Sequence, residues 1–302
     1  MNRRDLLKKT LVGAGMAAGL GSLPQWSFGA EDAKPSKAKE AVLKLCSQDG
    51  RIPGANLAEK VKKLEAWGAA GIEFGGDPNV QEIKPILADS KLKVSALCWG
   101  SDNGNLVSMD LKVRQGGIDK LKKALEKAGE LGANGVIFVP CFHKQSDLKP
   151  EELDKVLMEI LPGLGDFAQQ HKTHILLEPL CKNETFYINS VVQAAKICDM
   201  VKNPGIAQMG DFFHMSTEDP DQKAAFLAAD KHLLHVHMAS RKSRNLPGTD
   251  DDNYVEGFRG LKLIGYQQFV SLECGIKKGQ NPEEAIPACF DLLRKQWEEA
   301  TV

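Results

Sequence analysis

Short apolar runs alternate with longer amphipathic segments along most of this chain. Eight short apolar runs have four to seven residues, and several are flanked by Gly, Pro or Asn, which is typical of buried parallel strands. They cover residues 41–46, 71–74, 93–98, 135–139, 174–178, 205–211, 233–237 and 269–273. The segments between them repeat apolar residues at helical spacing and cover 56–67, 81–88, 118–131, 151–170, 190–201, 221–229, 254–264 and 282–298. This alternation predicts an α/β fold, a single (β/α)8 barrel.

The last four apolar runs each end in a side chain that can hold a metal. These terminal residues are Glu178, Asp211, His237 and Glu273, separated by 33, 26 and 36 positions. One strand–helix–strand unit takes roughly 30 residues, so the four groups fall on successive strands. The carboxyl ends of barrel strands meet at one mouth, where active sites are built. The spacing therefore predicts that the four side chains converge there.

Three carboxylates and one imidazole form a hard ligand set. A glutamate at the end of a buried strand, such as Glu178, is costly unless it is paired or bound to a metal. The set suits one divalent ion, Mn²⁺ before Mg²⁺ or Co²⁺. Of His235 and His237 we expect only His237 to point into the barrel, with His235 packed or hydrogen-bonded elsewhere. Glu73 on the second strand is left open between the site and an internal salt bridge.

The first 30 residues have the pattern of an export signal. Arg3 and Arg4 precede a Gly/Ala-rich apolar run and then small residues, which favours the twin-arginine route. The run is too short and too rich in glycine for a good membrane-spanning helix. We therefore expect a signal peptide over 1–30, a polar linker over 31–40 and a barrel domain over 41–302, giving a periplasmic protein that is not inserted in the membrane.

The net charge and the cysteine content limit which partners and which disulfides we expect. Residues 1–30 hold four basic side chains and one acidic one, so the remainder carries 35 basic against 39 acidic residues, a formal charge of −4. An acidic chain without a basic run argues against nucleic acid as a partner. The seven cysteines are dispersed and include no C-x-x-C pair, a poor framework for disulfides.

Residues 177–189, 210–215, 235–237 and 247–248 resemble the xylose isomerase-like TIM barrels, and among these the ketose 3-epimerases and related sugar isomerases. The resemblance is sharp from about residue 176 to residue 273. It implies that the four strand-end residues bind the metal. It also implies that Glu184, His214 and an arginine shortly after His237 bind sugar hydroxyls.

The chain departs from the family pattern just after His237. Ser240 stands where the family has a glutamate, and Ser243 stands where it has the arginine. A one-residue insertion would restore Arg244 to that role, with Arg241 as the rival. The departure bears on the substrate and leaves the metal ligands intact.

The candidate ligands also suggest a chemistry. A divalent ion polarises a ketone and stabilises the enediolate formed when the neighbouring carbon loses a proton. Glu178 and Glu273 lie on strands five and eight. One could remove the proton from one face of that carbon and the other could return a proton to the opposite face. We therefore expect a sugar isomerase or epimerase with a small carbohydrate substrate. Three other functions stay open: a lyase or dehydratase of a keto-cyclitol or 3-keto-glycoside, a non-catalytic carbohydrate-binding barrel, and a relative of the metal-dependent apurinic endonucleases. A homo-oligomer also stays open.

Overall fold

The computed structural model describes residues 40–302, and within them eight parallel strands close into a barrel in chain order. The strands are β1 (Lys44–Gln48), β2 (Gly71–Gly75), β3 (Lys93–Gly100), β4 (Val136–Phe138), β5 (Ile175–Leu177), β6 (Ile206–Asp211), β7 (Leu233–Met238) and β8 (Phe269–Leu272). The ring closes where β1 pairs with β8, with Cys46 opposite Ser271. The predicted α/β barrel is confirmed, while the expected signal over 1–30 and almost all of the 31–40 linker lie outside the described residues.

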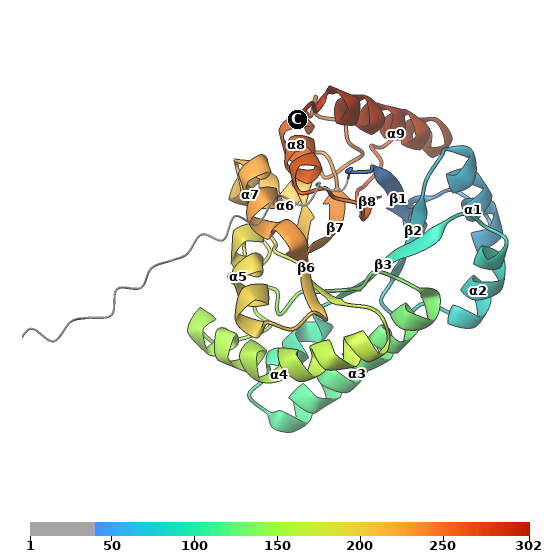
Figure 1. Cartoon of the computed structure of the whole chain (residues 1–302). Helices are drawn as coiled ribbons and strands as arrows, with labels where there is room; N and C mark the ends of the chain where they lie inside the picture. Colours follow the sequence, from blue (N-terminus) through green and yellow to red (C-terminus); the bar gives the residue numbers. More distant parts are fainter. Residues whose placement is uncertain (1–39) are drawn as a thin grey trace, which may run out of the picture. The chain divides into compact units, whose positions relative to one another are not determined.

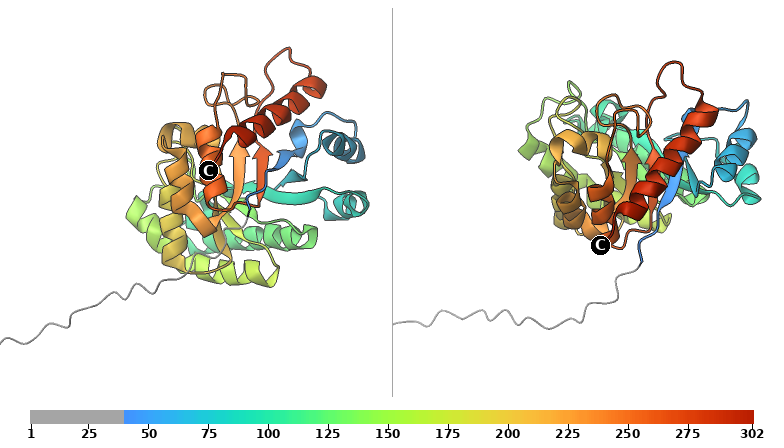
Figure 2. Two further views of the ribbon diagram at one scale, coloured as in Figure 1. Left: turned by 45° about the horizontal axis from the view of Figure 1, so that its top comes forward. Right: turned by 90° about the horizontal axis from the view of Figure 1, so that it is seen from above.

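Helices follow the strands and surround the barrel (Figure 1). They are α1 (Leu57–Ala66), α2 (Val80–Ala88), α3 (Leu111–Leu131), α4 (Pro150–Gln170), α5 (Val191–Val201), α6 (Phe212–Glu218), α7 (Gln222–Ala229), α8 (Val255–Leu263) and α9 (Pro282–Glu299). Short 3-10 turns lie at Asp49–Arg51, Asp102–Val107 and Asp230–His232. Figure 2 shows α9 (dark red) on the outside of the barrel, near β1 and β8.

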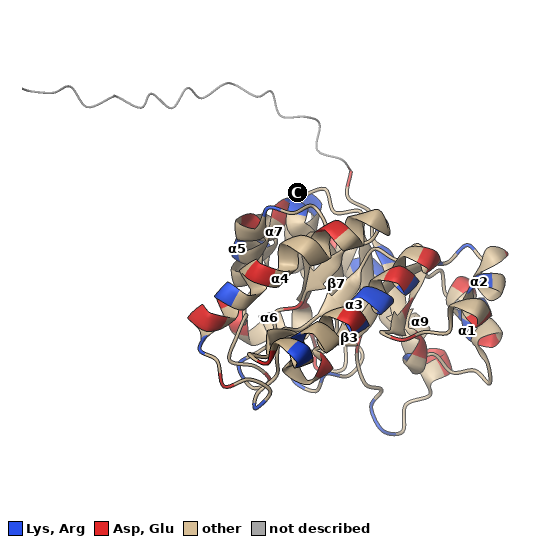
Figure 3. Ribbon diagram, turned by 90° about the horizontal axis from the view of Figure 1, so that it is seen from below, with Lys and Arg blue, Asp and Glu red and all other residues tan. Residues whose placement is uncertain are grey.

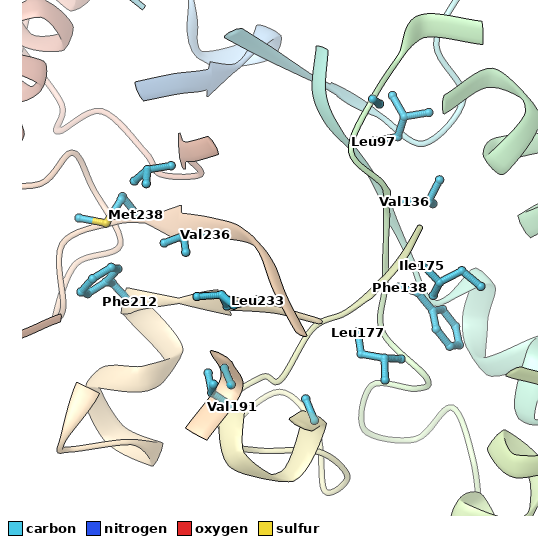
Figure 4. Close-up of a cluster of buried hydrophobic side chains, with 14 of the residues drawn as sticks. Leu97, Val136, Phe138, Ile175, Leu177, Val191, Phe212, Leu233, Val236 and Met238 are labelled. Atoms are coloured by element: carbon cyan, nitrogen blue, oxygen red, sulfur yellow. The ribbon is translucent and has the colours of Figure 1, made fainter. Parts of the chain in front are cut away.

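Alternate residues of each strand face opposite sides of the barrel wall. One set, including Val136, Phe138, Ile175 and Leu177, packs with helix residues in the main core (Figure 4). The intervening residues form a separate small cluster inside the ring, made of Ala96, Ile137, Leu176, Ala207 and Met209. This period of two fixes which strand-end side chains can reach the interior.

Two helical features differ from the sequence expectation. α3 begins at Leu111, seven residues before the predicted start, because Gly116 and Gly117 weaken the helical signal. At Gly117 a Cβ atom would lie 3.0 Å from the Leu106 backbone nitrogen, so the glycine lets the preceding turn pack closely on the helix. The short helix α6 was not predicted, because it starts directly after the last residue of β6.

The outer helices carry charged residues of both signs. On the face shown in Figure 3, basic (blue) and acidic (red) residues are interspersed over the outer helices. Within residues 40–302 no helix combines the length and the apolar content needed to cross a membrane.

Candidate active site

Four strand ends bring their polar side chains together at the mouth of the barrel. Glu178 follows β5, Asp211 ends β6, His237 lies in β7 and Glu273 follows β8. One ligand atom from each residue lies within 4.8 Å of those of the other three. We call these four residues the donor cluster. The structure thus brings together the four side chains that the sequence analysis selected.

The donor cluster continues the inward-facing rows of the strands. Each of its members stands two positions after a buried residue of the same strand: Leu176, Met209, His235 and Ser271. Side chains two apart on a strand point to the same face. The cluster is therefore the next layer toward the mouth, set directly above a buried one.

The same rule corrects one sequence expectation. His235 and His237 are two residues apart, so both point into the barrel, and both are fully buried. The Nε2 atoms of His235 and His237 lie 2.8 Å and 3.0 Å from Oε2 of Glu73. The expectation that only His237 faces inward is wrong, although His235 is hydrogen-bonded as expected.

Glu73 and Gln48 are site residues that the sequence analysis did not assign. Fully buried Glu73 receives a hydrogen bond from Nε2 of Gln48 at 2.9 Å as well as contacts from the two histidines. Gln48 Nε2 also lies 3.1 Å from Oε1 of Glu273, which links this layer to the donor cluster. The available signal was the inward parity of Glu73 in the apolar run of β2.

The three glutamates titrate in different directions because their neighbours differ. Burial and the nearby Glu273 carboxylate raise the pKa of Glu178 well above its usual range. Burial acts in the same direction on Glu273, but His237 and Arg244 outweigh it and lower the pKa of Glu273 to about 2. Burial would also raise the pKa of Glu73, yet His237 and His235 bring it well below its usual range.

The donor cluster fits a divalent cation. Within residues 40–302, the buried atoms Glu178 Oε1 and His237 Nδ1 make no hydrogen bond, and they lie 3.8 Å apart. Burial lowers the pKa of His237, but Glu73 and Glu273 overcome this and raise it well above its usual value. The carboxyl of Glu178 and the imidazole of His237 thus carry protons that an arriving cation would displace. Three carboxylates and one imidazole suit a hard divalent ion.

Arg244 reaches the donor cluster, whereas Arg241 does not. The Arg244 guanidinium lies 2.7 Å from Glu273 Oε2, 3.0 Å from Glu184 Oε1 and 3.4 Å from Asp211 Oδ2. Arg241 instead donates to the carbonyl of Asn253 at 2.6 Å. Of the two rival arginines, the geometry places Arg244 at the site, together with Glu184.

The loop after β7 explains how Arg244 arrives there. Arg244 has a φ of 52°, a left-handed conformation that non-glycine residues adopt at a cost. The Asp250 carboxylate accepts hydrogen bonds from the backbone N–H groups of Lys242 and Ser243, and Ser240 Oγ donates to Asp252 at 2.6 Å. Ser240, which stands at the glutamate position of the family pattern, is thus a fully buried loop anchor.

His214 is held as a hydrogen-bond donor toward the site. Its Nδ1 accepts from the backbone N–H of Cys181 at 3.1 Å, so in the neutral ring the proton sits on Nε2. Burial lowers the pKa of His214, which favours this neutral form. Nε2 lies 3.5 Å from Asp211 Oδ2 and, among the described residues, makes no hydrogen bond. His214 can therefore donate to a polar group that approaches the donor cluster.

Comparison with known sequences adds a family and its members. The sequence model of the family described as xylose isomerase-like TIM barrel matches residues 61–296. The 3-dehydro-D-guloside 4-epimerase of Escherichia coli (strain K12) is 27% identical over 267 residues, covering 83% of this chain and 99% of that protein. The ketose 3-epimerase of Arthrobacter globiformis is 26% identical over 230 residues, covering 74% of this chain and 79% of that protein.

Solved structures show the same fold. The apo 3-keto-D-glucoside 4-epimerase of E. coli superposes with a TM-score of 0.76 at 24% identity, covering 84% of this chain and all of that one. The crystal structure of the IOLI protein with a binding zinc atom gives a TM-score of 0.71 at 21% identity, covering 86% of this chain and 99% of that one. At these identities the superpositions show the shared barrel fold and no more.

Proposed function

Since the chain belongs to the xylose isomerase-like TIM barrel family, we propose that it is a divalent-metal-dependent epimerase acting on a carbohydrate at a carbon next to a ketone. The observation that carries the proposal is the placement of two glutamates within the donor cluster, on strands separated by those of Asp211 and His237. Glu178 comes from β5 and Glu273 from β8, with Asp211 and His237 from the two strands between them. The expectation of an isomerase or epimerase agrees with the names of the relatives described above.

The chain supplies a proton acceptor and a proton donor on separate strands. When bound, the metal ion would polarise the ketone oxygen of the substrate. One glutamate would remove the proton from one face of the neighbouring carbon, and the other would return a proton to the opposite face. Such acid–base steps are typically worth about 10²–10⁴ in rate. His214 Nε2 and Arg244 would donate to substrate hydroxyls while Glu184 accepts, which would fix the reacting carbon between the two carboxyl groups.

We propose keto-glycosides as the first substrate class to test, and free ketoses as the second. The alignment with the 3-dehydro-D-guloside 4-epimerase covers 99% of that protein, against 79% for the ketose 3-epimerase. Both names describe inversion next to a carbonyl group, so the two classes share one chemistry. Manganese is the proposed ion because hard oxygen ligands predominate in the cluster.

The deciding assay is incubation of both substrate panels with the Mn²⁺-loaded protein in deuterated water. An epimerase gives the inverted product with deuterium at the carbon next to the carbonyl, as seen by NMR. Loss of a group beyond that carbon, giving an unsaturated product, would instead indicate the lyase. If the metal binds but neither panel shows exchange or product, that outcome would favour the non-catalytic carbohydrate-binding barrel over the epimerase.

We also propose that the chain is exported to the periplasm by the twin-arginine route, on the pattern of residues 1–30. The test replaces Arg3 and Arg4 by lysine and follows the precursor by cell fractionation. Retention of the precursor in the cytoplasm supports the proposal. Normal appearance of the processed variant in the periplasm contradicts it.

A further inference from the structure

Glu73 lies below the donor cluster and touches no member of it except His237. It projects from β2, on the other side of the β1–β8 seam from β7, and is fully buried. Three side chains meet its carboxylate: Gln48 at 2.9 Å, His235 at 2.8 Å and His237 at 3.0 Å. A carboxylate in the barrel interior with this many partners is a built feature, since an unpaired one would be strongly disfavoured.

The contact determines which nitrogen of His237 faces the donor cluster. An ionised carboxylate can only accept hydrogen bonds, so Nε2 of His237 must carry a proton. Nδ1 then points away from Glu73 and lies 3.3 Å from Glu273 Oε2 and 3.8 Å from Glu178 Oε1. Within the described chain Nδ1 makes no hydrogen bond. It is the ring nitrogen left for a ligand at the mouth.

We propose that Glu73 is the positioning residue of the site, holding His237 with its proton on Nε2 so that Nδ1 is the metal-binding atom. This inference rests on the proposed metal-dependent function. Carboxylates that accept from the second nitrogen of a metal-binding histidine fix its tautomer and ring orientation. Glu73 does this from a strand remote in sequence, 164 residues from His237.

A carboxylate at position 73 differs from the uncharged amide of the same shape in the hydrogen bonds it can make. A glutamine there could turn its NH₂ group toward the ring and donate to Nε2. The ring proton would then move to Nδ1, and the lone pair needed by the ion would be lost. Glu73→Gln therefore changes hydrogen-bond direction with almost no change in volume, which makes it the informative variant.

The experiment compares Mn²⁺ affinity of the parent, Glu73→Gln and His235→Asn by calorimetry against a competing chelator. Loss of an outer carboxylate of this kind typically weakens metal binding by about 10–100-fold, and we expect that loss in Glu73→Gln. His235→Asn is the matched control: it removes another buried partner of the same carboxylate but leaves the Glu73–His237 contact, so its affinity should stay close to that of the parent. Equal affinity of Glu73→Gln and the parent, or an equal loss in both variants, would overturn the proposal.

A second readout needs no variant. In long-range proton–nitrogen NMR spectra of histidine-labelled parent protein loaded with Zn²⁺, His237 should show metal at Nδ1 and a proton at Nε2. Metal at Nε2 would overturn the assignment even if Glu73→Gln fails to fold. If the parent binds neither ion, the proposed metal dependence fails first. If the parent binds metal and shows the expected tautomer but no epimerisation, only the proposed reaction fails.

Discussion

Two adjacent layers of the barrel interior contain acidic residues and histidine, yet their carboxylates have different hydrogen-bond partners. In the lower layer Glu73 is surrounded by donors from Gln48, His235 and His237. In the donor cluster above it, buried carboxyl oxygens of different residues face one another, and Glu178 Oε1 makes no hydrogen bond within the described residues. The Glu73 carboxylate of the lower layer thus has its donors within the protein, whereas Glu178 Oε1 and His237 Nδ1 of the upper layer are left for a cation or substrate. This difference separates a structural ion network from a binding site, although both use the same residue types.

The largest expected effect tests chemistry in the upper layer. Glu273→Gln keeps an oxygen for the ion and for Gln48 but removes the proton acceptor, so turnover should fall by about 10²–10⁴ while metal stays bound. Turnover is measured by the deuterium exchange assay and metal content by elemental analysis. The surface change Glu298→Gln on α9 is the control and should leave both unchanged. Full activity in Glu273→Gln would remove Glu273 from the mechanism.

Removing the carboxylate of the lower layer should lower the free energy of unfolding. Glu73→Ala leaves His235 and His237 buried without their acceptor, and breaking a buried ion pair from one side costs about 3–5 kcal/mol. Urea unfolding of the metal-free protein measures this loss. A change below about 1 kcal/mol would show that the network contributes little, a value usual for exposed pairs.

The arginine that joins the upper layer gives an intermediate effect. Arg244→Ala removes a cation that contacts Glu184, Asp211 and Glu273, so we expect kcat/KM to fall by about 10–100-fold, corresponding to the loss of one or two charge-assisted hydrogen bonds. Arg241→Ala is the matched control from the same loop and should stay within about threefold of the parent, a free-energy change of less than 1 kcal/mol. Equal effects in the two variants would mean that the loop as a whole matters and not the Arg244 contacts.

The smallest expected effect is a gain in stability, whereas the changes above are losses. Because burial and Glu273 raise the pKa of Glu178, the folded metal-free protein binds a proton there more tightly than the unfolded chain does. The stability associated with Glu178 is therefore lost as pH rises above its usual value of 4.5. Glu178→Gln has no proton to lose and should be more stable than the parent at neutral pH, by about 1–3 kcal/mol. Urea unfolding at pH 5 and pH 7.5 with a chelator present checks it; a gap that narrows as pH rises would contradict the argument.

Sequence periodicity predicted the barrel and the donor cluster because both depend on strand order and strand ends. It did not predict α6 or the first turns of α3, where a short helix and paired glycines give a weak signal. The choice between Arg241 and Arg244 depends on a left-handed backbone at Arg244, which residue preferences do not indicate. The role of Glu73 depends on contacts across the barrel interior, which the sequence pattern does not indicate. Because His235 was expected to face outward, its contact with Glu73 was not predicted.

The hydrogen bond between Gln48 and Glu273 joins residues 225 positions apart, across the seam where β1 meets β8. The four donor-cluster residues come from the adjacent strands β5 to β8, whereas Gln48 and Glu73 come from β1 and β2, so closure of the ring adds the Gln48 and Glu73 contacts to the cluster. Contacts of such high sequence separation form at a large entropic cost and slow folding. A refolding chain whose ring is still open would therefore present the four metal-binding side chains without the Glu73 contact that orients His237, and it should bind the ion more weakly than the closed barrel.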